Sequence, residues 1–290
     1  MPLPPAPPAD VLFLPADTFA NDVVFITGAG TGIGIGKGLA ETFARHGARV
    51  AVASRGKEHR EAGVKAVAAV GGRAAGIEVN VRSAESIKAA FDRTEAELGP
   101  VSIVVNNAAA NFPAVSEKLS PKGWAAITQS VLDGTFFCCT EFARRRIAAG
   151  LPGAILNIGA TYGWTGGPGA APSAAAKAGV MNLTQSLAVE WAPDGIRVNG
   201  IAPGVFPHRD FPPAMLALQM PDEDAGKRIP AGRVGRMHEI GRAACFLCSP
   251  FASYITGHNL VVDGGNWLRR TLWMPEFQPV REWADSRNLR

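Results

Sequence analysis

From Asp22 onward, short runs of apolar and often β-branched residues alternate with longer segments of helical periodicity. This alternation predicts βαβ units and therefore a parallel sheet. Several runs are apolar throughout, as expected of strands that helices cover on both faces. The predicted strands are Val23–Thr27, Val50–Ser54, Ala74–Asn80, Ile103–Asn106, Ala154–Gly159, Arg197–Ala202 and Asn259–Val262. The predicted helices start near Gly36, Lys57, Ser83, Pro121, Pro172 and His238.

Three segments depart from this alternation. Residues 1–18 begin with a proline-rich stretch and are expected to form a flexible N-terminal arm. Residues 206–233, after the sixth predicted strand, are compatible with a lid over a substrate and equally with a covering helix and a loop. Residues 266–290 contain several tryptophans and are expected to pack on their own subunit or on a neighbouring one. Between the two ends, residues 19–265 show no linker and no internal repeat, so we expect one domain there.

The composition is that of a folded protein and narrows the expected partners. Of the 290 residues, 47% are hydrophobic and 19% are charged, which excludes a disordered chain. The net charge is +4 and the arginines are scattered, so nucleic acid is not an expected partner. We find no membrane-spanning apolar run, no secretory or transit pattern and no peroxisomal address at Asn288-Leu289-Arg290. These features predict a cytoplasmic protein that does not contact membranes.

The four cysteines are expected to be buried thiols in a reducing compartment. Cys138 and Cys139 are adjacent, and Cys245 and Cys248 lie one helical turn apart in an apolar stretch. No histidines cluster near them in the sequence, and no two histidines have the spacing of a ligand pair. The sequence therefore predicts no metal site.

A glycine-rich turn, Thr27-Gly28-Ala29-Gly30-Thr31-Gly32-Ile33-Gly34-Ile35-Gly36, follows the first predicted strand directly. Glycines at such a turn let backbone N–H groups approach a pyrophosphate, and the N-terminus of the following helix adds a favourable dipole. A glycine motif alone is weak support, but its position on the first strand–helix turn of an alternating chain is specific. This turn predicts a dinucleotide site.

The end of the second predicted strand indicates which dinucleotide binds. An acidic residue there would hold the ribose hydroxyls of NAD, but the strand ends in Ser54-Arg55. An arginine can pair with the 2′-phosphate of NADP(H), so we predict NADPH/NADP as the cofactor. The alternative is that Arg55 is only a solvated surface side chain. Asn80, at the end of the third strand, is in a position to hydrogen-bond the adenine.

From about Phe19 to Gly265, the chain resembles the short-chain dehydrogenase/reductase family. The matching motifs are Thr27-Gly28 with Gly32-Ile33-Gly34, Asn106-Asn107-Ala108, Lys177, Pro203-Gly204 and Val262-Asp263-Gly264-Gly265. The resemblance implies a Rossmann-type, doubly wound, seven-stranded parallel sheet in a three-layer α/β/α domain, and a homotetramer. It also implies cofactor contacts from Gly28, Thr31, Gly32, Ile33, Gly34, Ile35, Gly36, Ser54, Arg55, Asn80, Val81, Asn107, Ala108, Lys177, Pro203, Gly204, Val205 and Phe206.

The glycine turn departs from the family pattern by length. Two more residues separate Thr27 from the body of the helix than in most of the family. This longer spacing is similar to that of the enoyl-ACP reductases in the same superfamily. Gly34-Ile35-Gly36 can therefore close the turn in place of Gly32-Ile33-Gly34. The sequence leaves open which of these glycines contacts phosphate.

The catalytic tyrosine of the family is not at its usual position. Most members carry it four residues before the lysine, where this chain has Ser173, and Ala160 stands in place of the assisting serine. A serine hydroxyl is a far weaker acid than a phenol and cannot replace it as a proton donor. Of the two tyrosines, Tyr254 is expected to pack structurally. Because strand side chains repeat every two residues, Tyr162 is expected to point where the missing serine would have pointed.

With its tyrosine at this displaced position, the chain resembles the 2,4-dienoyl-CoA reductases of this family, particularly the mitochondrial type. The motifs that match are Asn106-Asn107-Ala108-Ala109-Ala110-Asn111-Phe112, Tyr162, Pro172-Ser173-Ala174-Ala175-Ala176-Lys177 and Arg228-Ile229-Pro230-Ala231-Gly232-Arg233. The resemblance implies that Tyr162, Lys177, Asn111 and Ser173 are the catalytic residues. It also places Arg82, Phe112 and Ser120 at the acyl-CoA, and puts Val131 where the wider family has an asparagine.

Some positions differ from this group. Ala110 replaces a glycine, and the lid has no counterpart of the arginine that grips the CoA, a role that His208 or Arg209 would have to fill. The longer C-terminal tail is similar to that of the peroxisomal trans-2-enoyl-CoA reductases. The leading hypothesis is NADPH-dependent reduction of a conjugated C=C of a 2,4-dienoyl or 2-enoyl thioester. The alternatives are reduction or oxidation of a ketone or alcohol with Tyr162, and a catalytically weak NADP-binding protein.

Overall fold

The structure, a computed structural model, describes residues 2–29, 34–111, 115–207 and 221–268. Seven parallel strands form its central sheet, in the order β3-β2-β1-β4-β5-β6-β7. They are β1 (Val23–Thr27), β2 (Arg49–Ser54), β3 (Arg73–Glu78), β4 (Ile103–Asn106), β5 (Gly153–Ile158), β6 (Ile196–Pro203) and β7 (Asn259–Val262). The predicted doubly wound sheet is thus confirmed.

Three predicted strands, at Val23–Thr27, Ile103–Asn106 and Asn259–Val262, have the observed bounds, and the other four differ by one or two residues at one or both ends. The third strand was predicted to reach Asn80 but ends at Glu78. Beyond it the chain turns, with the Asn80 side-chain oxygen accepting a hydrogen bond from the backbone N–H of Arg82. Such a local side-chain bond competes with strand pairing.

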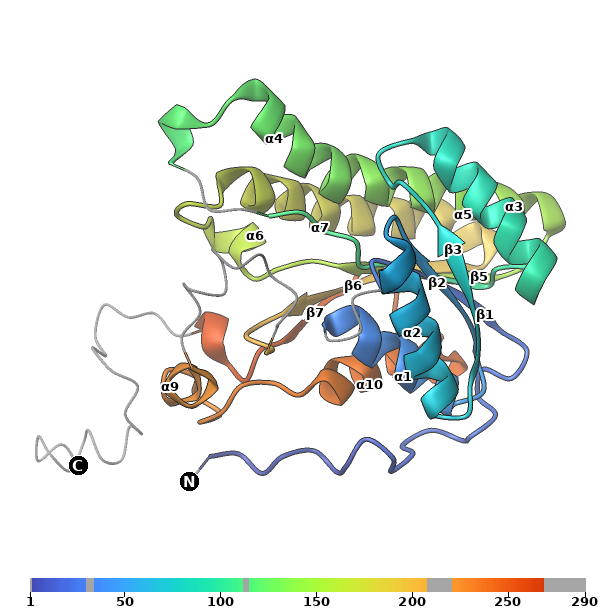
Figure 1. Ribbon diagram of the computed structural model, residues 1–290, viewed down its shortest axis with the longest axis horizontal. Coiled ribbons are helices and arrows are strands. Elements are labelled where there is room, and N and C mark those ends of the chain that lie inside the picture. Colours follow the sequence, from blue (N-terminus) through green and yellow to red (C-terminus); the bar gives the residue numbers. More distant parts are fainter. Residues whose placement is uncertain (1, 30–33, 112–114, 208–220, 269–290) are drawn as a thin grey trace, which may run out of the picture.

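Helices cover both faces of the sheet (Figure 1). The helices on one face are α1 (Ile35–Arg45), α2 (Lys57–Ala69) and α10 (Met237–Cys248). Those on the other face are α3 (Ala84–Leu98), α5 (Gly134–Ala149) and α7 (Ala171–Trp191). Alternate residues of a strand face opposite helix layers: Val24 and Ile26 of β1 join one core cluster, and Val23 and Phe25 join the other. This arrangement confirms the three-layer architecture.

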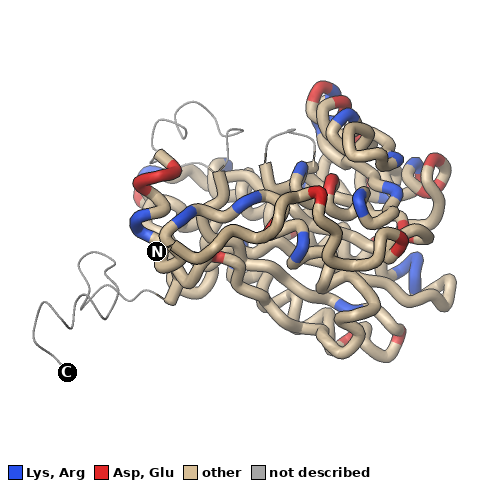
Figure 2. Tube along the Cα trace, turned by 90° about the horizontal axis from the view of Figure 1, so that it is seen from below, with Lys and Arg blue, Asp and Glu red and all other residues tan. Residues whose placement is uncertain are grey.

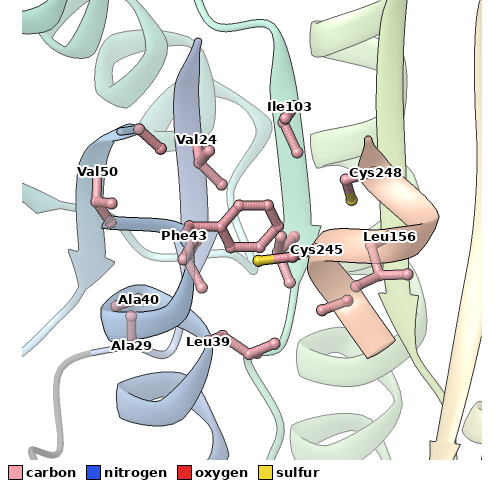
Figure 3. Close-up of a cluster of buried hydrophobic side chains, with 14 of the residues drawn as sticks. Val24, Ala29, Leu39, Ala40, Phe43, Val50, Ile103, Leu156, Cys245 and Cys248 are labelled. Carbon is pink, nitrogen blue, oxygen red and sulfur yellow. The ribbon is translucent and has the colours of Figure 1, made fainter. Parts of the chain in front are cut away.

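The first of these clusters lies between the sheet and helices α1 and α10 (Figure 3). Phe43 of α1 packs there with Cys245 and Cys248 of α10. Cys138 and Cys139 of α5 are buried in the second cluster, so all four thiols are buried, as expected. Burial raises the pKa of Cys139 and of Cys248 to about 12, and a thiol that stays protonated at neutral pH is unreactive.

Shorter elements complete the described chain. They are η1 (Ser116–Lys118), α4 (Pro121–Thr128), η2 (Gln129–Asp133), α6 (Tyr162–Thr165), η3 (Ala192–Asp194), α9 (Asp222–Lys227), η4 (Pro250–Ala252) and η5 (Asn266–Leu268). Element η2 is a π-helical turn that joins α4 to α5. Val131, at the position of the family's asparagine, lies in this turn and is buried. Turns of this kind are frequent at functional sites.

The described parts of the two end segments, residues 2–18 and 266–268, lie against the domain. In the N-terminal arm, which we expected to be flexible, the Leu3 N–H donates to the Ala231 carbonyl, and Arg242 of α10 donates to the carbonyls of Pro7 and Pro8. Prolines lack a donor, and arginine supplies many, so one side chain can hold several carbonyls of the arm. At the other end, the Trp267 ring lies 5.1 Å from that of Trp164 in α6, which places this part of the tail on its own subunit.

Part of the predicted lid, residues 206–233, falls outside the described residues, as do Trp273 and Trp283 of the tail. The described part contains α9 and a return segment in which the Ala231 N–H donates to the Gly264 carbonyl.

Charged residues of both signs are distributed along the chain trace (Figure 2). No helix in the described residues is long and apolar enough to span a bilayer.

Candidate active site

Three of the four predicted catalytic residues lie together beyond the end of β5. Tyr162 is the first residue of α6, and its hydroxyl oxygen lies 3.1 Å from the Ser173 hydroxyl oxygen near the start of α7. Lys177 follows Ser173 by one helical turn, so the two side chains share a helix face. The Lys177 ammonium donates a hydrogen bond to the Ile158 carbonyl at the end of β5. The structure therefore places the Tyr162 phenol within hydrogen-bonding distance of Ser173 and anchors Lys177 to the end of β5.

The route by which Tyr162 reaches this place differs from our expectation. We assigned it the alternation of a strand, but β5 ends at Ile158 and Tyr162 begins a short helix. The phenol meets Ser173 because α6 packs directly against α7: a Cβ on Gly163 would lie 2.8 Å from the sulfur of Met181. Tyr254, expected to pack, is instead fully exposed. A loop before an edge strand can leave even a large side chain in solvent.

Burial shapes the acid–base properties of Lys177. Its side chain is buried, and desolvation lowers its pKa to about 8. The ammonium form is disfavoured when water is removed, because the one carbonyl that it contacts replaces only part of its hydration. A lysine of this kind can change its charge near neutral pH.

Asn111 has a different environment from the other three residues. Its side-chain oxygen is buried and has no hydrogen-bond partner among the described residues. A buried polar atom without a partner destabilises a protein by about 1–3 kcal/mol, and such atoms occur where function requires them. The neighbouring Phe112, a predicted acyl-CoA contact, lies outside the described residues.

A chain of buried polar groups beneath the site escaped the sequence analysis. The Asn106 amide donates to the Asn157 side-chain oxygen at 2.8 Å, and the Asn157 amide donates to the Thr184 hydroxyl at 2.9 Å. These bonds connect β4, β5 and α7, which carry the loops and side chains of the site. The available signal was Asn157 itself, a lone polar residue in an otherwise apolar strand.

The turn after β1 forms a close-packed cradle with the loop after β4. Gly28 has a φ of +67°, and a Cβ there would lie 2.9 Å from the Ala108 Cα. The Asn107 amide donates to the carbonyls of Thr27 and Gly28, both at 3.1 Å, and the Thr27 hydroxyl accepts from the backbone N–H groups of Asn107 and Ala108, both at 3.0 Å. Strand order reverses between β1 and β4, and ligands of such sheets bind at this crevice. The cradle fits a dinucleotide.

The start of α1 bears on the choice between the two glycine triplets. Helix α1 begins at Ile35 with Gly34 at its N-cap, and a Cβ on Gly36 would lie 2.6 Å from the Gly28 carbonyl oxygen. Gly36 thus makes the close contact between helix and turn, which favours closure of the turn by Gly34-Ile35-Gly36. Thr31, Gly32 and Ile33 lie outside the described residues.

The predicted adenosine contacts gather at the ends of β2 and β3. Arg55 is exposed directly after β2, and the Ser54 hydroxyl donates to the Gly56 carbonyl. Asn80 is exposed after β3, and Val81 packs against Gly134 of α5. These side chains share one edge of the sheet because parallel strands end there together.

The end of β6 carries the last predicted cofactor contacts. The Gly204 N–H donates to the Val262 carbonyl, and a Cβ on Gly204 would lie 2.4 Å from the Asp263 Cβ, so no side chain fits there. Pro203 ends β6, Val205 is exposed and Phe206 is buried.

Two predicted substrate residues are described, and both have partners within the chain. The Ser120 hydroxyl accepts from the Gly123 N–H and caps α4. The Arg82 guanidinium donates to the Gln129 side chain in the π turn. Neither bond excludes a substrate contact, and Arg209 and His208 lie outside the described residues. Among the residues that the structure describes, no three His, Cys, Asp or Glu side chains are grouped to hold a metal ion.

Comparison with known proteins places this site in a family. A family profile described as "Enoyl-(Acyl carrier protein) reductase" matches residues 28–266. The chain belongs to the short-chain dehydrogenase/reductase family. It is therefore an oxidoreductase, and the family and fold together imply a nicotinamide cofactor.

The relatives with curated names include several dienoyl-CoA reductases. A Bacillus subtilis protein named as a probable 2,4-dienoyl-CoA reductase, (2E)-enoyl-CoA-producing, is 40% identical over 84% of this chain and 96% of its own. A peroxisomal 2,4-dienoyl-CoA reductase of Arabidopsis thaliana, (3E)-enoyl-CoA-producing, is 36% identical over 90% of this chain and 89% of its own. These relatives confirm the resemblance to 2,4-dienoyl-CoA reductases, while the mitochondrial subtype stays a prediction, since the second of these relatives is named as peroxisomal.

Solved structures agree with the fold. A short-chain dehydrogenase from Bacillus anthracis has a TM-score of 0.77 and 38% identity, covering 87% of this chain and 98% of that one. A short-chain type dehydrogenase/reductase from Mycobacterium marinum has a TM-score of 0.78 and 30% identity, covering 86% and 97%. The fold that the sequence predicted is thus one that related proteins adopt.

Proposed function

We propose that this enzyme uses NADPH to reduce a conjugated carbon–carbon double bond of a 2,4-dienoyl or 2-enoyl thioester. The observation that carries the proposal is the 3.1 Å contact between the Tyr162 and Ser173 hydroxyls. It puts the phenol over the helix position where most of the family has its tyrosine, but brings it there from α6. The names of the dienoyl-CoA reductases among the relatives support the same substrate class.

The chemistry assigns a role to each residue. NADPH, when bound, would be the hydride source for the far end of the conjugated system, and negative charge would then develop on the thioester oxygen. The Tyr162 hydroxyl and the Asn111 amide would donate hydrogen bonds to that oxygen, as an oxyanion hole does. Ser173 would hold the phenol in place, and Lys177 would bind the nicotinamide ribose. Protonation of carbon by water or a side chain then completes the reduction.

Cofactor choice depends on the end of β2. Arg55 is exposed there, where its guanidinium can pair with a 2′-phosphate. Gly28, Gly36 and Asn107 would line the pyrophosphate turn. Metal ions have no part in this proposal.

The test is to mix the protein and NADPH with a 2,4-dienoyl-CoA, a 2-enoyl-CoA or a set of ketones, and to follow NADPH oxidation. We expect oxidation with the thioesters. Oxidation with ketones alone would contradict the proposal, and no oxidation with any substrate would favour a binding protein. Identifying the product double bond at position 2 or position 3 would reveal which carbon accepts the proton.

The assembly proposed with this function is a homotetramer. Exposed apolar side chains on the outer helices, Phe136 and Ile147 of α5 and Val189 of α7, offer surfaces that a second subunit would cover. Sedimentation of the purified chain tests the assembly, and a monomer at micromolar concentration would contradict it. The cytoplasmic location also stays a prediction.

A further inference from the structure

Arg60 of α2 reaches back to the end of β2, beside the proposed 2′-phosphate position. Its guanidinium donates to the Arg55 carbonyl at 2.7 Å and to the Ser54 carbonyl at 3.0 Å. The same group lies 3.3 Å from a carboxylate oxygen of Glu78 at the end of β3. Helix α2 runs beside β2 and β3 in Figure 1, so one side chain spans the ends of both strands.

The chain makes specific room for this arginine. The side chain of Arg60 is 12% exposed, whereas that of Glu78 is 70% exposed. Gly76 of β3 faces it, and a Cβ there would lie 3.2 Å from the Arg60 Cβ. A nearly buried guanidinium is stable only when hydrogen bonds and a counter-charge replace its hydration. The two carbonyls and Glu78 supply these partners.

The bonds of Arg60 fix the backbone on both sides of Arg55. The Ser54 carbonyl precedes the Arg55 Cα and the Arg55 carbonyl follows it, and both are held by the same rigid guanidinium. The direction of the Arg55 side chain depends on this backbone. Arg60 also adds a second positive charge at the end of β2, and the exposed Glu78 offsets that charge only in part, because water screens it.

We infer that Arg60 is a positioning residue for cofactor selection, holding the β2 terminus so that Arg55 meets a phosphorylated ribose. The inference rests on the proposed binding of NADPH. A purely structural role, in which Arg60 only anchors α2, predicts a different outcome. Loss of an anchor would lower stability and weaken all adenosine ligands alike. Loss of a positioning residue changes the preference between phosphorylated and unphosphorylated ligands.

The experiment measures dissociation constants of 2′,5′-ADP and 5′-AMP for the whole chain by calorimetry. We expect the wild type to prefer 2′,5′-ADP and Arg60→Met to lose roughly tenfold of that preference, the size of effect that one charge-assisted contact produces. Arg60→Lys, which keeps the charge and loses the fork, should lose less. Glu78→Gln should tighten the binding of 2′,5′-ADP and leave that of 5′-AMP unchanged.

Arg73→Met is the matched control, because Arg73 also donates to a backbone carbonyl, that of Glu97, but from the opposite end of β3. It should leave the preference unchanged. An Arg60→Met variant with the wild-type preference would overturn the inference and leave the proposed function intact. A wild type without preference would overturn NADPH selection itself. If Arg60→Met does not fold, unchanged preferences in both Arg60→Lys and Glu78→Gln would overturn the inference.

Discussion

The two halves of the sheet build their parts of the site by different means. At the ends of β1 and β4 the cradle is made of backbone: Gly28 and Gly36 leave no room for a side chain, and the Asn107 amide donates to the carbonyls of Thr27 and Gly28. Beyond β5 the site is made of side chains, Tyr162 and Ser173, which come from two different helices. Backbone geometry tolerates few substitutes, whereas a side-chain function can move to another element that reaches the same point.

This difference explains how the usual tyrosine position can hold a serine. The phenol is delivered from α6, and Ser173 becomes its hydrogen-bond partner. The glycine turn has no such freedom, since only glycine fits where a Cβ would meet backbone atoms. Substitutions in the two halves should therefore separate chemistry from cofactor binding.

The largest expected effect belongs to Tyr162→Phe. Removing one donor to the developing oxyanion should lower kcat for a dienoyl-CoA by about 10²–10³, with NADPH affinity unchanged. Steady-state kinetics and cofactor fluorescence measure the two quantities. Tyr254→Phe is the control, because it removes a fully exposed phenol and should change neither. Equal losses in turnover and NADPH affinity would contradict the separation of the halves.

Lys177→Met should abolish turnover and raise the free energy of unfolding. Burial lowers the pKa of Lys177 from 10.5 to about 8, so at pH 7 the folded protein carries an ammonium that would be better solvated in the unfolded chain. Between about pH 8 and pH 10 the unfolded chain keeps the Lys177 proton and the folded protein loses it. The free energy of unfolding should therefore rise as pH increases from about 8 to 10. Replacement by methionine should remove this rise and raise the free energy of unfolding at pH 7 by up to about 3 kcal/mol.

Urea unfolding at pH 7 and pH 10 measures this change, and turnover should be lost at both values. Lys88→Met, on the exposed side of α3, is the matched control and should leave the pH dependence of stability as it is. A destabilised Lys177→Met with an unchanged pH profile would mean that Lys177 is held charged by its surroundings.

Arg55→Ala should affect only cofactor binding and leave the chemistry at Tyr162 unchanged. We expect NADPH to bind roughly ten- to a hundredfold more weakly, as for loss of a charged hydrogen bond, while NADH is little affected. Titration of protein fluorescence with each cofactor measures this. Arg93→Ala, which removes an exposed arginine of α3 paired with Glu97, should leave both affinities unchanged. Equal weakening of NADPH and NADH would contradict the phosphate role of Arg55.

Sequence reasoning reached the sheet and most helix starts because their signals are local. Uninterrupted apolar runs mark the strands, and Ser120 before Pro121 marks the cap and first residue of α4. It could not find the π turn, since Gln129–Asp133 keeps a helical pattern and differs only in its hydrogen bonding. It placed Tyr162 in a loop after the fifth strand and extended the strand alternation to it, because nothing local marks the four-residue helix α6. Contacts between distant segments, such as Arg242 with the N-terminal arm, have no local signal.

The smallest expected effect tests a residue with two possible roles. Ser120 caps α4 through the Gly123 N–H, and family resemblance also places it at the acyl-CoA. If capping is its role, Ser120→Ala should lower the free energy of unfolding by about 1 kcal/mol and leave KM for the thioester unchanged. Ser83→Ala is matched to it, because Ser83 caps α3 in the same way through the Ser86 N–H. If both variants lose similar stability but only Ser120→Ala raises KM for the thioester, the Ser120 hydroxyl contacts the substrate in addition to capping α4.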